Sequence, residues 1–344
     1  MAIKRVTMQD IADACGLSRN TVSKVFNGRA SVPQATRMLI LQKAEELGYG
    51  LPGKGGDAFS SRIGGSIALL TNKLPRDAHF GTNMLSSMSD NMSRAGYTLR
   101  IFEVSADETR AKRLPPFFDR DKVAGIVAIE LFDADYLDMV CGLGIPTISV
   151  DGPRTAISTL MNCDFISMEN IASMIAVVQR LAGAGAKSIG FVGDREHCSS
   201  FYERWYAFGN GLQKSGLPLD ESLCILAPDS APYGDPEWLM RQVGRMPELP
   251  DAFVCANDYL GIQMMTALKR MGLSIPRDVM VTGFDGTSQS ALVDPPLTTV
   301  KIPGDEIGLI AAKHLLNRIQ KPGMPYGWTR IRTTPVWRGS IREK

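Results

Sequence analysis

The chain contains few of the residues that build metal centres, disulfide frameworks or membrane spans. Of its 344 residues only three are histidine and six are cysteine, and the cysteines are scattered without a C-x-x-C pair. This distribution is typical of reduced thiols and indicates neither a disulfide framework nor a structural zinc site. No apolar run approaches the roughly 18 residues that cross a bilayer, and the start MAIKRVTMQD holds no secretory signal. We therefore expect a cytoplasmic protein with no membrane partner, metal or other cofactor.

A large charge of one sign is also lacking. The 38 Lys and Arg residues oppose 36 Asp and Glu residues, which leaves a net charge of +2. Residues 1–65 hold nine basic and five acidic side chains, a net +4, so the remaining residues sum to −2. A basic head on a mildly acidic body favours a polyanion as the partner of the head. A difference of this size also arises by chance, so charge supports a nucleic-acid partner without establishing it.

Hydrophobic periodicity predicts three short helices between residues 6 and 48. Thr7 starts a capping-box pattern, and Gly16 ends this first helix. Ser18 is a favourable N-cap for the second helix, and Pro33 suits the first position of the third. Helices joined by a short turn containing glycine fit a helix-turn-helix unit. The side chains expected to face inward are Met8, Ile11, Ala12, Cys15, Val22, Val25, Phe26, Ile40, Leu41, Ala44 and Leu47.

After a linker rich in glycine, GLPGKGGDAFSSRIGG at 50–65, the pattern changes. Apolar β-branched runs such as SIALLTN, GIVAIE and TISVD alternate with amphipathic stretches, which predicts parallel sheets covered by helices. About 280 residues exceed what one doubly wound sheet needs, so we expect two similar lobes. Ligands bind beyond the carboxyl ends of strands in such sheets. The acidic residues expected there, facing a cleft, are Asp151, Asp194, Asp258 and Asp285.

The second predicted helix, at 18–27, keeps a polar face once its apolar residues are buried. Arg and Lys can donate to guanine, Asn can pair with adenine, and Ser or Thr can hold phosphates. An isolated stretch of this kind would be an ordinary solvated surface. The surrounding helix-turn-helix, the basic charge and the flexible tether together favour a helix that reads the DNA major groove. Its polar side chains are Arg19, Asn20, Ser23, Lys24 and Asn27.

The stretch VTMQDIADACGLSRNTVSKVFNG, followed by TRMLILQKAEELGY, resembles the head of the LacI/GalR family of repressors. The body is similar to that family in GIPTISVDG, FVCANDYLGIQMMTALKRMGLSIPRDVMVTGFDG, PPLTTVKIPGDEIGLIAAKHLL and the final WRGS. The order and spacing of these blocks extend the resemblance over nearly the whole chain. It implies a homodimer that binds a pseudo-palindromic operator in double-stranded DNA, with affinity gated by a small, sugar-like effector.

The implied fold is an all-α helix-turn-helix head on an α/β, two-lobed, periplasmic-binding-protein-like body with two doubly wound parallel sheets. We place the head at 1–49, the hinge at 50–65, and the effector-binding and dimerisation body at 66–344. The two body lobes are then expected at about 66–162 with 293–324 for lobe one, and about 163–292 with 325–344 for lobe two.

The resemblance also implies roles for single residues of the head. Arg19, Asn20 and Lys24 fall at base-reading positions, and Lys24 lacks the bidentate fork of the arginine that relatives often carry there. Phe59 stands where relatives insert a leucine into the minor groove, although packing onto lobe one explains it equally well. The glycines around Phe59 make a poor helix, so we expect a weak hinge. Phosphate-facing or capping positions are implied for Thr7, Ser18, Thr21, Ser23, Asn27 and Thr36.

In the body, the resemblance implies an effector held by polar side chains and packed against Phe80, for which a core position is the simpler explanation. Carboxylates accept hydrogen bonds from hydroxyls, Arg donates through a rigid fork, and Asn does both. The loop AHFG at 78–81 and the pair EN at 169–170 depart from the N-P-F-F and D-N of many relatives and leave the ligand's identity open. The implied polar contacts are Asp151, Arg204, Asn257 and Asp285.

Two other classes of protein would share this body. A solute-binding protein would need a signal peptide and no DNA-binding head. A sugar-acting α/β enzyme would need catalytic residues, and the chain has no G-x-G-x-x-G after a strand, no G-x-S-x-G, and no histidine at triad spacing. We interpret His79, His197 and His314 as surface or rim residues. The sequence therefore predicts a transcriptional regulator, and more specifically a repressor, without catalytic residues.

Overall fold

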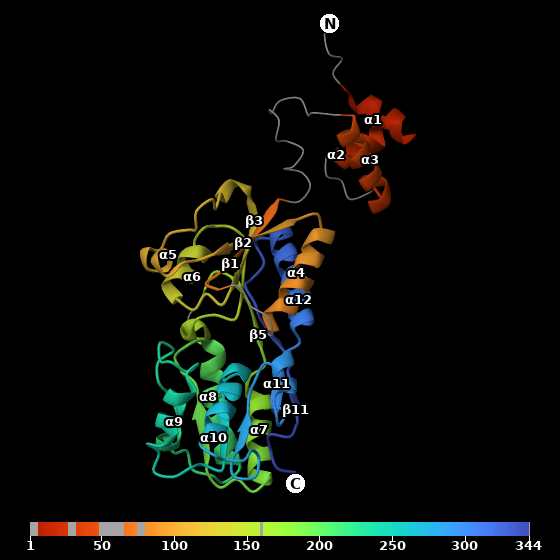
Figure 1. The fold of residues 1–344 in the computed structure, drawn as a ribbon. Helices are drawn as coiled ribbons and strands as arrows, with labels where there is room; N and C mark the ends of the chain where they lie inside the picture. Colours follow the sequence, from red (N-terminus) through yellow and green to blue (C-terminus); the bar gives the residue numbers. More distant parts are fainter. Residues whose placement is uncertain (1–5, 27–31, 48–64, 74–79, 159–160, 344) are drawn as a thin grey trace. The chain divides into compact units, whose positions relative to one another are not determined.

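The computed structural model describes residues 6–26, 32–47, 65–73, 80–158 and 161–343 (Figure 1). The chain divides into two compact units, Met1–Gly65 and Ser66–Lys344. They are called here the head and the body, and each is described by itself. Asn27, Phe59 and His79 lie outside the described residues, as does the side chain of Phe80.

The head contains the helices α1 (Met8–Cys15), α2 (Arg19–Phe26) and α3 (Gln34–Glu46). Thr7 caps α1 through a complete capping box, and Gly16 ends the helix in the left-handed conformation at φ 64°. Ser18 Oγ accepts a hydrogen bond from Thr21 N at 3.1 Å at the start of α2. Both helix starts match the prediction, whereas α3 begins one residue after Pro33.

Side chains from all three helices form the core of the head. The buried ones are Ile11, Ala12, Val22, Val25, Phe26, Ile40 and Ala44, all of which the periodicity had predicted to face inward. Leu47 was predicted to join them, but it is 39% exposed. It follows the last residue of α3, so the helical spacing that would turn it inward no longer applies.

Lobe one of the body is built on one parallel sheet. Its six strands lie in the order β10-β5-β4-β3-β1-β2. Side chains alternate across it, as expected for strands: Ile67 and Leu69 of β1 pack on one face, and Ala68 and Leu70 on the other. The strands are β1 (Ser66–Thr71), β2 (Thr98–Glu103), β3 (Val123–Ile129), β4 (Thr147–Val150), β5 (Asp164–Met168) and β10 (Trp328–Ile331).

Helices cover both faces of this sheet (Figure 1). The long helices α4 (Phe80–Arg94) and α12 (Gly304–Gln320) pack side by side on one face, where Met84 and Met88 of α4 join the core. The shorter helices α5 (Ala106–Ala111) and α6 (Ala134–Cys141) lie on the other side of the sheet.

Lobe two has a smaller parallel sheet of β6 (Ile189–Val192), β7 (Ala252–Cys255) and β8 (Met280–Thr282). An antiparallel ribbon adjoins it, formed by β9 (Thr299–Lys301) and β11 (Thr334–Val336). The helices are α7 (Ile171–Gly183), α8 (Ser199–Lys214), α9 (Pro236–Val243), α10 (Asp258–Arg270) and α11 (Ser288–Leu292). Short 3₁₀ turns occur in lobe one at η1 (Arg120–Lys122) and η2 (Arg154–Ile157), and in lobe two at η3 (Glu221–Leu223).

The predicted borders between the lobes need correction. We expected residues 163–168 and 325–344 in lobe two, yet β5 and β10 pair with each other and extend the sheet of lobe one. The later part of the second range, from β11 to Ser340, does lie in lobe two. We expected residues 293–302 in lobe one, yet bridges join Thr298 to Thr282 and Lys301 to Asp285 in lobe two. Backbone pairing between distant segments decides these borders, and local composition does not indicate it.

Among the described residues, no helix is long and apolar enough to span a membrane.

Candidate effector cleft and DNA-binding helix

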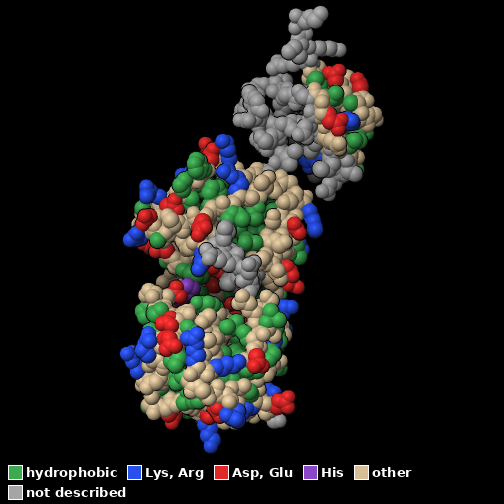
Figure 2. All heavy atoms as spheres, in the orientation of Figure 1, with side chains coloured by type: hydrophobic (Ala, Val, Ile, Leu, Met, Phe, Trp, Pro, Cys, Tyr) green, Lys and Arg blue, Asp and Glu red, His purple; other side chains and the backbone are tan. Residues whose placement is uncertain are grey.

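Three acidic residues lie between the lobes, each beyond the carboxyl end of a strand. Glu130 follows β3, Asp151 follows β4, and Asp285 comes after β8. Their φ angles are 54°, 57° and 119°, a region that non-glycine residues rarely adopt and that is enriched at functional sites. Figure 2 shows a hollow between the lobes, with acidic side chains and a histidine at its margin. All three carboxylates therefore follow parallel strands at the end of the sheets where ligands bind in such folds.

Burial and neighbouring charges shift the pKa of two of these carboxylates. Burial raises the pKa of Asp285 well above its usual value; Arg204 opposes this, and the charges of Asp258, Glu130 and Asp151 add to it. Burial likewise raises the pKa of Glu130 to about 7, with Asp151 adding to the shift. Sequence reasoning missed Glu130, although the run GIVAIE ends on it in the same way as the four acidic residues that were selected.

Arg204 projects from α8 and is almost completely buried, at 2% exposure. Its Nη1 donates to the Ala256 carbonyl at 2.6 Å and lies 3.5 Å from Asp285 Oδ1. The guanidinium carbon stands 3.7 Å from the centroid of the Phe284 ring. Hydrogen bonds and ring stacking together hold the planar fork in one orientation. Arg204 and Asp285, both predicted site residues, are thus in contact.

Asp151 is held from the opposite lobe. Its Oδ1 accepts hydrogen bonds from Ser199 Oγ at 2.6 Å and from Gly152 N at 2.9 Å. Ser199 is the first residue of α8, so this contact joins the lobes. An ion pair between Arg154 and Glu196, at 2.7 Å, joins them on the same side. Asp151 therefore lies at the side of the cleft where the two lobes contact each other.

Asn257 occupies a different position from the Arg204–Asp285 pair. It caps α10, where its Oδ1 accepts from Leu260 N at 2.9 Å. It also lines a pocket of about 240 Å³ in lobe two, together with Asp194, His197 and Asp229. The structure thus places Asn257 in a neighbouring pocket of the same lobe and gives it a capping role that the prediction had not included.

His197 lies at the rim of that pocket, as predicted. Its ring lies 4.7 Å from the Phe132 ring of lobe one and 4.9 Å from Phe201. Its Nδ1 is 3.4 Å from Asp229 Oδ2. Burial lowers the pKa of His197, but Asp229 and the nearby acidic residues outweigh this effect, so the pKa is raised.

Asp258 does not face the cleft, contrary to the prediction. It is fully buried inside lobe two, where its carboxylate accepts hydrogen bonds from Thr287 N at 2.7 Å and from the hydroxyls of Thr287 and Thr299. Asp194 accepts from two loop N–H groups, those of Glu196 and Asp229. Both acidic residues follow strands. The Asp258 carboxylate, however, is hydrogen-bonded to Thr287 and Thr299 and stabilises the packing of these segments.

In the head, burial divides α2 as the periodicity predicted. Val22, Val25 and Phe26 pack into the core, which leaves Arg19 and Asn20 exposed. The other polar positions of the head are more involved in local structure. Thr7 and Ser18 cap helices, Thr21 Oγ1 lies 2.8 Å from Ser18 Oγ, and Ser23, Lys24 and Thr36 are half-buried.

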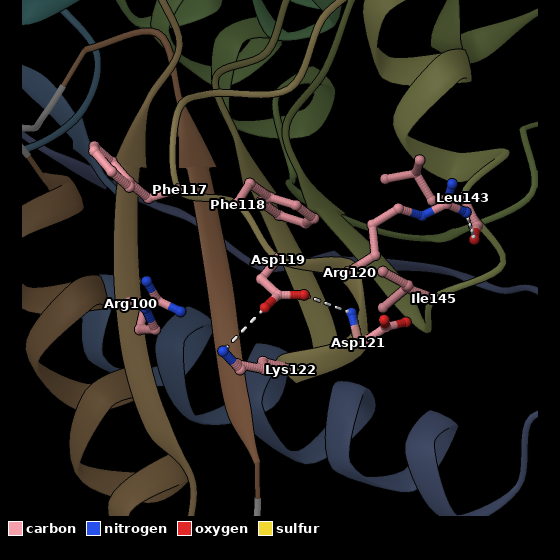
Figure 3. Close-up of a pocket in the computed structure, with 9 residues that line it drawn as sticks. All are labelled: Arg100, Phe117, Phe118, Asp119, Arg120, Asp121, Lys122, Leu143 and Ile145. Atoms are coloured by element: carbon pink, nitrogen blue, oxygen red, sulfur yellow. Dashed lines mark hydrogen bonds and ion pairs between the residues drawn. The ribbon is translucent and has the colours of Figure 1, made fainter.

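Another hollow lies on lobe one, at the opposite ends of the strands (Figure 3). Three of its charged side chains already have partners: Asp119 pairs with Lys122 at 3.1 Å, and Arg120 donates to the Leu143 carbonyl at 2.7 Å. The hollow lies before β3, away from the carboxyl ends of the strands, where the predicted site residues lie.

No group of three or more His, Cys, Asp or Glu side chains in the described ranges can hold a metal ion.

Comparison with known proteins assigns both units of the chain. The model of bacterial regulatory proteins of the lacI family matches residues 7–50, and a periplasmic binding protein-like domain matches residues 178–341. The HTH-type transcriptional regulator MalR of Streptomyces coelicolor is 28% identical, over 97% of this chain and 96% of its own length.

Solved structures show the same fold. A transcriptional regulator CelR–cellobiose complex matches with a TM-score of 0.71 and 24% identity, over 98% of this chain and 100% of the other. A lac repressor dimer bound to operator and the anti-inducer ONPF matches with a TM-score of 0.71 and 20% identity, over 99% and 100%. The predicted helix-turn-helix head and two-lobed α/β body are therefore confirmed.

Proposed function

Because the chain belongs to the LacI family of bacterial regulatory proteins, we propose that it is a repressor that binds a pseudo-palindromic DNA operator as a homodimer. A small effector bound between the lobes of the body gates that affinity. The observation that carries this proposal is the joining, in one chain, of an exposed polar helix in a small head with a buried polar cleft in the body.

The head supplies the contact with DNA. Arg19 and Asn20 stand exposed at the start of α2, where a recognition helix contacts base edges. Arg donates in a bidentate manner to guanine, and Asn pairs with adenine. The half-buried Lys24 lies one turn further along, and hydroxyls such as that of Thr21 suit phosphates. One such helix makes few base contacts, so specific binding needs two heads on two half-sites.

The body supplies the effector site, which we propose takes a sugar or a sugar derivative. Asp151, Asp285 and Arg204 are buried around the cleft, and carboxylates with a guanidinium match the donors and acceptors of a hydroxylated ligand. Two structural neighbours were solved with cellobiose and with ribose. Asn257 and Phe80 complete the proposed set, Asn257 from the neighbouring pocket and Phe80 from the start of α4.

Gating requires that the effector favour one arrangement of the lobes. The contacts that join the lobes, such as Asp151 with Ser199, stand beside the proposed ligand groups, so a bound ligand alters them directly. We propose no catalytic activity for this site. Its place of action is the cytoplasm, where a bacterial regulator meets the chromosome.

The test combines operator selection with effector titration on the full-length chain. Fragments selected from random DNA should converge on a pseudo-palindrome bound by a dimer in sedimentation experiments. Cellobiose, maltose, lactose and D-ribose are then titrated against that complex, and at least one should change operator affinity. A chain that hydrolysed these sugars and selected no DNA sequence would instead be an enzyme.

A further inference from the structure

Asn170 lies at the start of α7 but does not cap it. An Asn at this position usually accepts a hydrogen bond from the first turn of the helix, and the Asn170 side chain makes no such bond. Glu169 performs the capping instead. Its Oε1 accepts from Ile171 N at 2.8 Å and from Ala172 N at 2.7 Å. The start of the helix is therefore satisfied without the Asn170 amide.

The Asn170 amide is used in the cleft. Its Oδ1 accepts a hydrogen bond from Arg204 Nε at 2.9 Å. Its Nδ2 donates to Glu203 Oε2 at 2.8 Å and to the Met168 carbonyl at 3.1 Å. Asn170 is 0% exposed, so all of its polar atoms depend on these partners. An amide has one accepting and one donating end, and these contacts define which end faces Arg204.

Glu203 is fixed in turn from β10. Its Oε1 accepts a hydrogen bond from Arg330 Nη2 at 2.6 Å. A continuous chain of polar contacts therefore runs from the edge strand of the lobe-one sheet to the cleft. Its members, in order, are Arg330, Glu203, Asn170, Arg204 and Asp285.

We propose that Asn170 is a positioning residue that holds the Arg204 guanidinium in its ligand-binding orientation, with Glu203 and Arg330 fixing the Asn170 amide. The importance of this orientation for a ligand rests on the function proposed above, whereas the orientation itself can be measured without any ligand. A guanidinium has five N–H donors. Asn170 takes the Nε–H, and the Ala256 carbonyl accepts from Nη1, which leaves further donors for a bound molecule.

The decisive experiment follows the Arg204 Nε–H signal by ¹H–¹⁵N NMR in the full-length protein, assigned by its loss in Arg204→Lys. In Asn170→Ala the acceptor is missing, so we expect this proton to exchange with water about tenfold faster or more. Asn91→Ala is the matched control, because Asn91 donates to the Ser87 carbonyl within α4 of lobe one. Equal exchange in wild type and Asn170→Ala, or equal acceleration in the control, would overturn the proposal.

A charge-swapped pair distinguishes positioning from a general loss of structure. Asn170→Asp loses the donor to Glu203 and sets two carboxylates against each other, so repulsion moves the acceptor away from Arg204 Nε and we expect exchange faster than in wild type. Adding Glu203→Gln restores a donor between these two side chains and still offers an oxygen to Arg330. The double variant should regain slow exchange to within about twofold of wild type. Failure of this rescue would contradict the proposed chain of contacts, even if Asn170→Ala does not fold.

A second measurement joins the positioning to the effector. The half-maximal concentration of cellobiose or D-ribose for the operator response should rise about tenfold or more in Asn170→Ala, and operator affinity without sugar should not change. A wild-type chain that responds to neither sugar would count against these effectors. The NMR result would still decide whether Asn170 positions Arg204.

Discussion

The head and the body place their proposed binding side chains in opposite environments. In the head, Arg19 and Asn20 stand in solvent on one helix, and the core below them only orients that helix. In the body, Arg204 and Asp285 are buried and come from elements about 80 residues apart, since their ion pair joins positions 81 residues distant. A residue in a surface site can be replaced at little cost in stability. In a buried site the same side chains serve both ligand binding and folding, so a replacement affects both.

The largest expected effect is in the body. Arg204→Leu leaves the Asp285 carboxylate buried without its cation, and breaking a buried pair in this way costs about 3–5 kcal/mol. In denaturant titrations we expect the free energy of unfolding of the body to fall by this amount. The free energy of unfolding of the head should not change. Arg195→Leu is the control, since its exposed pair with Glu221 is worth less than about 1 kcal/mol. Equal stability of both variants would show that the two units differ less than proposed.

The matching change in the head is Ile40→Ala. Ile40 is 0% exposed in the small core, and truncation of such a side chain costs about 2–5 kcal/mol. We expect loss of operator binding by mobility shift, with the body's unfolding transition unchanged. Leu39→Ala, at an exposed neighbouring position, should keep operator binding. If Ile40→Ala lowered the stability of the body as well as that of the head, the two units would unfold as one cooperative unit.

A smaller effect depends on pH and concerns the body alone. The folded-state pKa of Glu130 is raised from 4.5 to about 7, so the folded protein holds this proton more tightly than the unfolded chain. Its contribution to stability is full below about pH 4.5 and is lost as the pH rises through about 7. Glu130→Gln should remove up to about 3 kcal/mol of this dependence and be the more stable protein at pH 8.

The measurement is the free energy of unfolding of the body between pH 4 and pH 8. Glu306→Gln, an exposed acidic position in α12, serves as the control and should leave the wild-type slope intact. A Glu130→Gln variant with the wild-type slope would place the titration on another group, such as His197.

The smallest expected effect is in the head, where a surface residue can change without a cost in folding. Arg19→Ala should lose about 1–3 kcal/mol of operator affinity, confined to one base position in each half-site. Arg37→Ala removes the same charge from an exposed position of α3 and should weaken binding evenly across sequences. If Arg19→Ala also weakens all sequences evenly, Arg19 contacts the backbone of DNA and does not read bases.

The same contrast decides what sequence reasoning could predict. Helix starts at Thr7 and Ser18, and the buried stripe of α2, follow from local spacing and were predicted residue by residue. Strands of the body such as β1, β3 and β4 were predicted as well, because their apolar runs are local. The places of β5 and β10 in the lobe-one sheet were not, since pairing between residues about 160 positions apart has no local signature.

The cleft shows the same limit at the level of single side chains. Several acidic residues follow or end strands in this chain, and spacing alone cannot rank them. The fold turns Glu130, Asp151 and Asp285 to the space between the lobes, whereas it ties Asp258 to two threonines inside lobe two. Backbone torsion angles and the hydrogen-bond partners available in the fold determine which of these carboxylates lie in the cleft.

By itself, therefore, the sequence determined the helix caps, the apolar periodicities and the family blocks, because each depends on residues within a few positions of one another. The tertiary structure alone decided the lobe borders, the contact of Arg204 with Asp285, and the release of Asn170 from helix capping to the cleft. Those outcomes depend on buried polar groups that must find partners wherever folding brings them, and the partners lie on other elements of the chain.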